Sequence, residues 1–482
     1  MINPFSVVLI ILIGFSILKA RRPQELLFNM IILTASIELF VEVGYFIELG
    51  NSEITYRRAI ELTLFFVSIY VLVNRPIKKR KFYKYGFYLL TIAIVSLLFL
   101  VIFPSNAKVA NIENSWEDIL LQQKSIAKPA MSFFVVQQNF QLVIYVITLF
   151  AVYSSFQKED YFRLIKLVTK IIKFFFILGF FELILKDVLR FENYGKIVEY
   201  FFGFSEATIY EARTRGFGKE LTGLTKEASH YSYMLFICIT ILFSQYAITK
   251  SKRYYKWIII GMILILFCMS FSSVLFIIAL IAIYKLYKWN SVQSIKGRVK
   301  KLLFITALIA FVIIIVFSFN LNSLSSSSDD FFSRRISSLL EEKDVIFNGS
   351  WQTDNTALEW SNRVRLLSIF MTLKAFIARP IFGYGFGTIT CHGATAMMLA
   401  GTGIFGIYFW AKFNFYVSSI ITPNLNKKYF NYAIVIFLFV NLFNSFALRP
   451  FHELHSFFFA ISISLLFDST NKNEYNHNYS VV

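Results

Sequence analysis

Residues 380–406 contain two glycine motifs on either side of a histidine. The chain reads Pro380-Ile-Phe-Gly-Tyr-Gly-Phe-Gly387, then His392, then Gly401-Thr-Gly-Ile-Phe-Gly406 within an apolar run. Proline fixes φ, and glycine permits backbone conformations that other residues avoid. Pro380, Gly383, Gly385 and Gly387 therefore predict a non-helical turn. It lies near the end of the interval 320–394, the longest polar interval of the chain.

The composition is that of a polytopic membrane protein. Of the 482 residues, 57% are hydrophobic and only 16% are charged, whereas soluble domains have about 25% charged residues. Such a composition places the apolar runs against lipid. The runs predict an all-α fold with about 12–14 transmembrane helices, and they lie near 3–19, 25–47, 59–74, 86–103, 132–153, 167–187, 229–249, 257–271, 273–288, 302–319, 395–420, 431–447 and 456–467.

Basic clusters predict the orientation of these helices. The formal net charge is +19, but the lysines and arginines lie in short clusters between apolar runs, which favours a topology signal over nucleic acid as a partner. The positive-inside rule places the clustered loops in the cytoplasm and the intervals 104–131, 188–228 and 320–394 outside. The clusters begin at Lys19, Lys78, Lys158, Lys250, Lys296 and Lys427.

The predicted organisation has six segments. They are N-terminal transmembrane helices in 1–187, an outer loop in 188–228, central transmembrane helices in 229–319, a large outer loop in 320–394, C-terminal transmembrane helices in 395–467 and a cytoplasmic tail in 468–482. Within the large loop, Leu366, Phe370, Leu373 and Ile377 recur at helical spacing. They predict an amphipathic helix on the membrane surface.

Arginines lie in both predicted outer loops, and those of the first loop, Arg213 and Arg215, are candidates for binding a diphosphate. Arg213 and Arg215 lie close to glycines that let the backbone approach a ligand, and Arg363 and Arg365 lie near the start of the predicted amphipathic helix. Guanidinium groups bind phosphate oxygens through paired hydrogen bonds. The alternative is that these are solvated loops whose charges meet lipid headgroups.

Two residues directly before apolar runs are candidate proton acceptors, His392 and Glu227. The alternative for His392 is a polar residue with satisfied hydrogen bonds. Glu38 and Glu42 lie one turn apart in the second apolar run, where ionisable residues commonly serve function. They indicate either a coupling-ion site or pairing with basic groups of neighbouring helices.

The sequence predicts neither a metal nor another cofactor. Cys238, Cys268 and Cys391 are scattered, and His452 and His455 form a weak pair without a third ligand. The phosphate-binding motifs of nucleotide-dependent enzymes are absent from the sequence.

The chain resembles the O-antigen polymerase and ligase superfamily, the Wzy and WaaL type of polytopic bacterial envelope proteins. The matching pattern is Arg363, Pro380 to Gly387, His392, Leu399 and Gly403-Ile-Phe-Gly406. A second match is Gly223-Leu-Thr-Lys-Glu-Ala-Ser229, where Ala228 replaces the family's proline and Glu220 replaces an arginine. Gly393 also replaces the asparagine that often follows the histidine. The matches cover about a quarter of the chain.

The resemblance implies a metal-independent glycosyltransferase at the outer face of a bacterial inner membrane. Its donor would be a glycan on undecaprenyl diphosphate, and its partners would be membrane lipids, a lipid-linked acceptor, a chain-length regulator and a flippase. The arginines would stabilise the leaving diphosphate, with His392 as the first proton acceptor and Glu227 as the second. Direct displacement would invert the anomeric centre.

Three other functions stay open from the sequence. A ligase would use the same donor but transfer the glycan to lipid A core, whereas the favoured polymerase uses another lipid-linked repeat unit. A flippase for the lipid-linked glycan would need cationic residues along an intramembrane cavity. A structural or sensory membrane protein is the third alternative.

Overall fold

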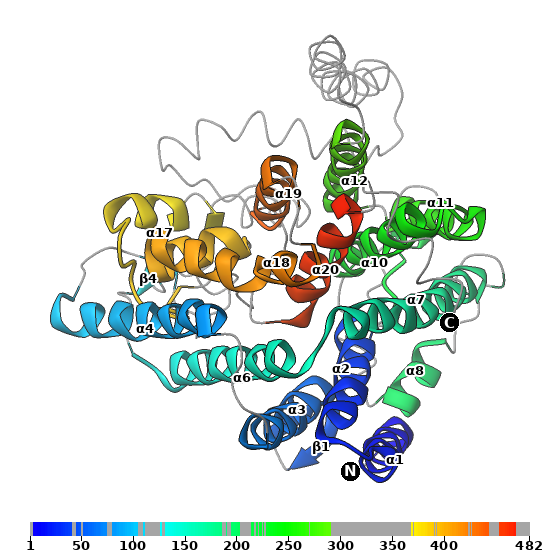
Figure 1. The fold of residues 1–482 in the computed structure, drawn as a ribbon, viewed down its shortest axis with the longest axis horizontal. Helices are drawn as coiled ribbons and strands as arrows, with labels where there is room; N and C mark the ends of the chain where they lie inside the picture. The colour runs from blue at the N-terminus through cyan, green and yellow to red at the C-terminus, as the bar shows by residue number, and fades with distance from the viewer. Residues whose placement is uncertain are drawn as a thin grey trace.

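The chain forms a bundle of helices in the computed structural model (Figure 1). Short hairpins supply the only strands within the described residues. The structure describes residues 3–40, 45–49, 52–74, 80–104, 109–110, 126–127, 131–185, 189, 194–202, 214–215, 218–219, 221–223, 225, 228–268, 270–290, 368–369, 371–389, 391, 393–422, 425, 427–442 and 453–468.

The helices follow the apolar runs of the sequence. In chain order they are α1 (Pro4–Lys19), α2 (Pro23–Phe40), α3 (Tyr56–Val73), α4 (Arg80–Ile102), α6 (Phe133–Ser155), α7 (Lys158–Leu183), α8 (Tyr194–Phe202), α10 (Ala228–Thr249), α11 (Lys252–Phe267), α12 (Phe271–Asn290), α17 (Ala394–Phe415), α18 (Val417–Ile421), α19 (Lys427–Val440) and α20 (Leu454–Asp468). The predicted run at 302–319 and the tail from 469 lie outside the described residues.

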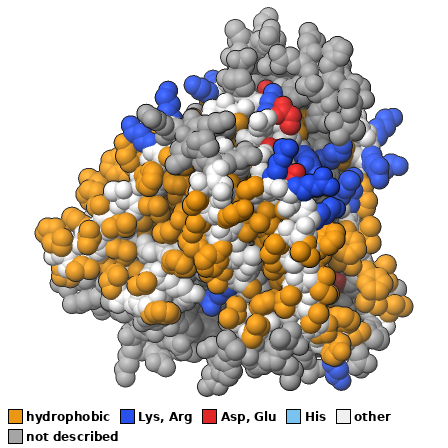
Figure 2. All heavy atoms as spheres, turned by 60° about the horizontal axis from the view of Figure 1, so that its bottom comes forward, with side chains coloured by type: hydrophobic (Ala, Val, Ile, Leu, Met, Phe, Trp, Pro, Cys, Tyr) orange, Lys and Arg blue, Asp and Glu red, His pale blue; other side chains and the backbone are white. Residues whose placement is uncertain are grey.

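Several helices are suited to a membrane. Five of those described are long and apolar enough to cross one: Lys81–Ile102, Val135–Ser155, Ala228–Thr249, Ser272–Asn290 and Ala394–Ile421. The space-filling view in Figure 2 shows a broad hydrophobic face with Lys and Arg side chains gathered along its upper edge. A face of this kind is stable against lipid and not against water. The chain is therefore an all-α membrane protein.

The second apolar run ends earlier than the sequence predicts. Helix α2 ends at Phe40, and residues 45–47, predicted as helix, belong to β1 (Tyr45–Leu49). This strand pairs antiparallel with β2 (Ser52–Thr55), with Ile47 opposite Ile54. Aromatic and β-branched residues favour strands, and the glycines on either side of β1 favour turns. The helical prediction for these residues is wrong because local strand preference outweighs apolar length.

The intervals predicted as outer loops contain local structure as well. The interval 188–228, predicted as a loop, contains α8, whose Phe202 ring lies 4.8 Å from the Phe5 ring of α1. Two further antiparallel hairpins join β3 (Val109–Ala110) to β4 (Ile126–Ala127) and β5 (Thr214–Arg215) to β6 (Gly218–Lys219).

Part of the predicted amphipathic helix is described. Residues 371–378 are helical, whereas residues 360–367 and Phe370 lie outside the described residues. Its packed positions include Thr372 and Ala375, while Ile377 of the predicted apolar stripe is 73% exposed. The Ile377 side chain therefore faces away from the bundle.

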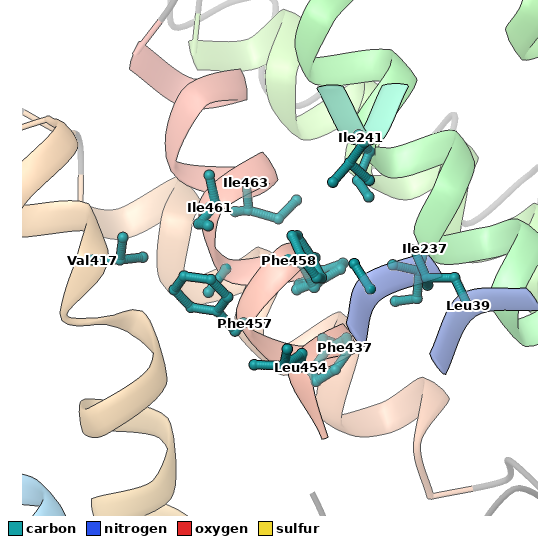
Figure 3. Close-up of a cluster of buried hydrophobic side chains, with 14 of the residues drawn as sticks. Leu39, Ile237, Ile241, Val417, Phe437, Leu454, Phe457, Phe458, Ile461 and Ile463 are labelled. Carbon is teal, nitrogen blue, oxygen red and sulfur yellow. The ribbon is translucent and has the colours of Figure 1, made fainter. Parts of the chain in front are cut away.

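Helix α20 is the centre of the bundle. Every residue from Leu454 to Asp468 is buried. Figure 3 shows its side chains between Val417 of α18 on one side and Ile237 of α10 and Leu39 of α2 on the other. The Phe459 ring stacks on Phe437 of α19 at 4.2 Å between centroids. A helix that is apolar on all sides is stable in a protein core or in lipid, and α20 is enclosed by the other helices.

We expect Phe459→Ala to lower the free energy of unfolding by about 3–5 kcal/mol, because a buried ring leaves a cavity when it is removed. Thermal unfolding in detergent measures the change. The matched control is Phe66→Ala, since the Phe66 side chain is 66% exposed and its loss opens no internal cavity. Equal effects of the two substitutions would contradict the central position of α20.

Candidate functional site

The two glycine motifs pack against each other through their backbones. The amide of Tyr384 donates to the carbonyl of Ala400 at 2.8 Å, and that of Gly385 donates to Gly401 at 2.9 Å. In the opposite direction, the amide of Ile404 donates to the carbonyl of Pro380 at 2.9 Å. The turn after Pro380 therefore lies directly on the kinked first half of α17.

This contact depends on glycine for two reasons. Gly383, Gly385, Gly387 and Gly403 have φ values of +67°, +100°, +84° and +68°, which side chains disfavour. A Cβ at Gly403 would also overlap the carbonyl oxygen of Ile381. Gly403 interrupts the helical backbone of α17, and this break accommodates the turn. The glycines thus serve the packing of one backbone on another.

The turn is also held by α4 and α6. The amide of Phe386 donates to Ser96 Oγ of α4 at 3.3 Å, and Asn139 Nδ2 of α6 donates to the Phe386 carbonyl at 2.9 Å. The guanidinium of Arg379 donates to the Phe103 carbonyl at 2.6 Å and lies 4.7 Å from the Tyr384 ring. Sequence analysis missed Arg379, although a basic residue directly before Pro380 was a signal for it.

The residues flanking His392 are fixed in place. The Thr395 amide donates to the Asn441 carbonyl at 3.2 Å, and its hydroxyl donates to the Leu438 carbonyl at 2.7 Å. The Gly393 amide donates to Cys391 Sγ at 3.2 Å. Burial raises the pKa of the Cys391 thiol to about 11. His392 itself lies outside the described residues, but both of its neighbours are anchored.

The entry into α10 is anchored in a similar way. The Leu221 amide donates to the Phe267 carbonyl at 3.3 Å, and the amide and hydroxyl of Thr222 each donate to Glu182 Oε1 at 3.4 Å. Gly223 then has a φ of +58°. Glu227 lies outside the described residues, and Ala228 directly after it begins α10.

The structure describes none of the four candidate guanidinium groups. Arg213, Arg363 and Arg365 lie outside the described residues, and only the backbone of Arg215 is described, in β5. Glu42 is also outside them. The assignment of these arginines to a diphosphate site stays a prediction.

A buried ionic cluster lies where α2, α3 and α20 meet. The guanidinium of Arg57, at the start of α3, pairs with Glu61 at 2.6 Å and with Glu453, directly before α20. Glu453 also contacts His455 Nδ1 at 3.1 Å. Glu38, near the end of α2, accepts the Leu454 amide at 3.0 Å. All five ionisable side chains are buried or nearly so.

This cluster contacts α10, which in turn lies beside the end of α19. The His455 ring meets the Tyr233 ring of α10 edge-on at 5.3 Å between centroids. The Tyr233 side chain lies beside the Asn441 side chain, and the Asn441 carbonyl accepts the Thr395 amide of α17. We call this region, where α2 and α19 end and α3, α10, α17 and α20 begin, the converging end of the bundle.

A small cavity adjoins the cluster. It measures about 20 Å³, room for about one water molecule, and it is lined by Glu38, Glu61, Leu64, Gln141, Ile144, Tyr145, Thr148 and Leu454. Of the residues in the ionic cluster, the sequence singled out Glu38 as a functional candidate and His455 only as part of a weak pair of metal ligands. Arg57 and Glu453 each lie just before an apolar run. This position was the sequence signal that could have identified them as members of a buried ionic cluster.

We expect Gly403→Ala to lower the free energy of unfolding by at least about 2 kcal/mol, from the unfavourable φ together with steric overlap. Thermal unfolding in detergent measures it. Gly14→Ala in α1 is the control, since a Cβ there meets nothing within 4 Å. An unchanged Gly403→Ala protein would refute the backbone contact between the two motifs.

We expect Arg57→Gln to lower the free energy of unfolding by about 3–5 kcal/mol, because it leaves buried carboxylates without their cation. The double variant Arg57→Gln with Glu453→Gln should recover part of this loss, as measured by thermal unfolding. If the double variant is less stable than the sum of the single effects predicts, the ion pair is not what holds α3 to α20.

The described residues contain no group of three His, Cys, Asp or Glu side chains placed to hold a metal ion. In comparisons with known proteins, no protein-family model matches the chain. No curated protein matches it either.

Proposed function

We propose that the protein is a membrane glycosyltransferase of the O-antigen polymerase type. It would transfer a growing glycan from undecaprenyl diphosphate to a lipid-linked repeat unit, and the product would be O antigen or capsule. The observation that carries the proposal is that the starts of α10 and α17 lie near the end of α19. Tyr233, in the second turn of α10, lies beside Asn441, and the Thr395 amide in the first turn of α17 donates to the Asn441 carbonyl. Helix α10 begins directly after Glu227, and α17 begins two residues after His392.

The chemistry needs an anion site and a proton acceptor. The acceptor hydroxyl attacks the anomeric carbon, the bond from that carbon to the diphosphate oxygen breaks, and the anomeric centre inverts. The hydroxyl proton passes to His392, or to Glu227 as the second candidate. Arg213, Arg215, Arg363 and Arg365 stabilise the charge on the departing diphosphate. The proposed reaction uses no metal.

The proposed topology follows the positive-inside rule. The bundle would cross a bacterial inner membrane about 12–14 times, with the converging end towards the periplasm or cell exterior. Lys158 at the start of α7 and Lys252 at the start of α11 then lie at the cytoplasmic side. The pathway's flippase and chain-length regulator are the expected partners.

The described cavity does not by itself provide the path that a flippase needs. A lipid diphosphate moving through the bundle would need a cationic path, but the cavity is lined by two carboxylates, Glu38 and Glu61, and by no basic residue. A ligase shares the donor and the proposed site, and differs only in transferring the glycan to lipid A core.

We expect cells lacking the protein to accumulate single repeat units without long glycan chains. Wild-type protein restores the ladder of chain lengths, and His392→Ala does not, because the acceptor hydroxyl loses its base. Gel analysis of surface and lipid-linked glycan measures both. His477→Ala in the C-terminal tail is the matched control and should restore the ladder.

Two other results would contradict the proposal. Full-length polymer stranded on the lipid diphosphate would identify a ligase. Repeat units trapped on the cytoplasmic side would identify a flippase.

A further inference from the structure

The exposed face of α7 changes character halfway along the helix. In the first half, the exposed side chains are all charged: Glu159, Arg163, Lys166 and Lys170. In the second half, they are all apolar: Phe174, Ile177, Leu178 and Phe181. Charged side chains are stable against water or lipid headgroups, whereas exposed apolar side chains are stable against lipid tails. On this helix the edge of the lipid tails therefore lies near Lys173.

Helix α11 changes in the same way along its length. Before Trp257, the exposed side chains are cationic or, in one case, a tyrosine: Lys252, Arg253, Tyr255 and Lys256. Beyond Trp257, they are all apolar: Ile259, Ile263 and Leu266. The edge of the lipid tails therefore lies near Trp257 on this helix.

The two changes lie at the same level, because α7 and α11 pack side by side (Figure 1). Lys173 Nζ lies 4.6 Å from the centroid of the Tyr254 ring. One turn further, the Phe176 ring lies 6.4 Å from the Trp257 ring. Both helices therefore run in the same direction and cross one common edge. Tyrosine and tryptophan at such an edge are typical of the boundary between a membrane and water.

The charged half of α7 is held against the start of α2. Gln24 Nε2 donates to Asp160 Oδ2 at 2.7 Å, and the guanidinium of Arg163 lies 4.9 Å from the centroid of the Phe28 ring. The three exposed cations of this half follow one another at intervals of three and four residues, so they lie on one face of the helix. They form a row that leads to the edge of the lipid.

The surrounding protein does not neutralise this row. Within the described part of the chain, no carboxylate forms an ion pair with Arg163, Lys166 or Lys170. Lys173, which covers Tyr254, and the neighbouring Arg253 extend the row onto α11. We call these five residues the basic surface. So many like charges repel one another unless anions from outside lie between them.

We propose that the basic surface binds the phosphate headgroups of anionic phospholipids in the leaflet that it borders. It continues directly into the apolar face of α7 and α11, so lipids whose tails contact that face bring their headgroups to it. Arginine binds phosphate oxygens in pairs, and lysine reaches them on a flexible stem. The positive-inside rule assigns this leaflet to the cytoplasmic side. The binding is independent of the proposed sugar transfer.

Lipid binding to the purified full-length protein tests the proposal. Native mass spectrometry in a neutral detergent gives dissociation constants for dioleoylphosphatidylglycerol and dioleoylphosphatidylcholine, which differ in their headgroups alone. The wild type should bind phosphatidylglycerol about tenfold more tightly. Combining Arg163→Gln, Lys166→Gln and Lys170→Gln should weaken phosphatidylglycerol binding about tenfold and leave phosphatidylcholine binding unchanged, because only the anionic headgroup loses its partners.

A triple variant elsewhere is the matched control. Lys81→Gln, Lys84→Gln and Lys412→Gln remove the same charge from exposed positions of α4 and α17. This variant should weaken phosphatidylglycerol binding less than about twofold. Equal losses in the two triple variants would mean that net charge alone attracts the lipid, and would overturn the proposal. A wild type that does not distinguish the two lipids would overturn it as well.

Two further results decide the nature of the ligand. Glu159→Gln removes the one exposed acid beside the row, and it should tighten phosphatidylglycerol binding about twofold because a repulsive charge is lost. Inorganic phosphate at the same concentration as the lipid should not displace it. Displacement by inorganic phosphate would identify a site for the free anion and would overturn the proposal.

Cysteine labelling in phosphatidylcholine vesicles tests the position of the edge. The chain has three cysteines, and the background variant carries Cys238→Ala, Cys268→Ala and Cys391→Ala. In it, Lys166→Cys should react with a membrane-impermeant maleimide at least about tenfold faster than Ile177→Cys, because lipid tails suppress thiolate formation and exclude the reagent. Equal rates at the two positions would show that no lipid edge lies between them, and would overturn the proposal.

Discussion

The interaction on which the bundle depends is the pairing of Arg57 with the carboxylates around it. A charge inside a membrane bundle is stable only when an opposite charge lies close by. Glu61, Glu453 and Glu38 all lie near the guanidinium, and this requirement fixes the start of α3, the end of α2 and the start of α20 in one place. Three carboxylates face one guanidinium, so the cluster carries an excess of negative charge when all are ionised. It is therefore unsuited to binding a diphosphate, and its contacts join α2, α3 and the start of α20.

Helix α20 carries that arrangement through the bundle. Its 15 residues are all buried, and its aromatic side chains contact α10 and α19. Because apolar contacts are not directional, they allow rotation and sliding that the ion pairs at its first turn prevent. The glycine contact of α17 acts differently: the absence of side chains lets two backbones hydrogen-bond directly, and the positive φ values exclude other residues. Ion pairing fixes α20, and backbone contact fixes α17.

These two constraints meet at the end of α19. Asn441 lies beside Tyr233 of α10 and binds Thr395 of α17, so the starts of these two helices lie near the same residue. In a proposed glycosyl transfer, a proton acceptor must lie within hydrogen-bonding distance of a hydroxyl while cationic groups hold the leaving group. Loops alone position such groups poorly, whereas rigid helix ends position them well.

The sequence by itself determined the membrane class, most helix positions and the turn after Pro380, because hydrophobicity and the φ limits of proline and glycine act locally. The helix expected near residue 395 indeed begins at Ala394. The helix predicted from apolar length at residues 45–47 was wrong, because the local strand preference of these residues prevails there. The tertiary structure alone decided that residues 380–385 pack on residues 400–404. It also decided that Arg57 pairs with Glu453, which in turn contacts His455. The pairing of Arg57 with Glu453 joins residues from opposite ends of the chain, and both contacts depend on which surfaces meet, a property that no local pattern in one sequence contains.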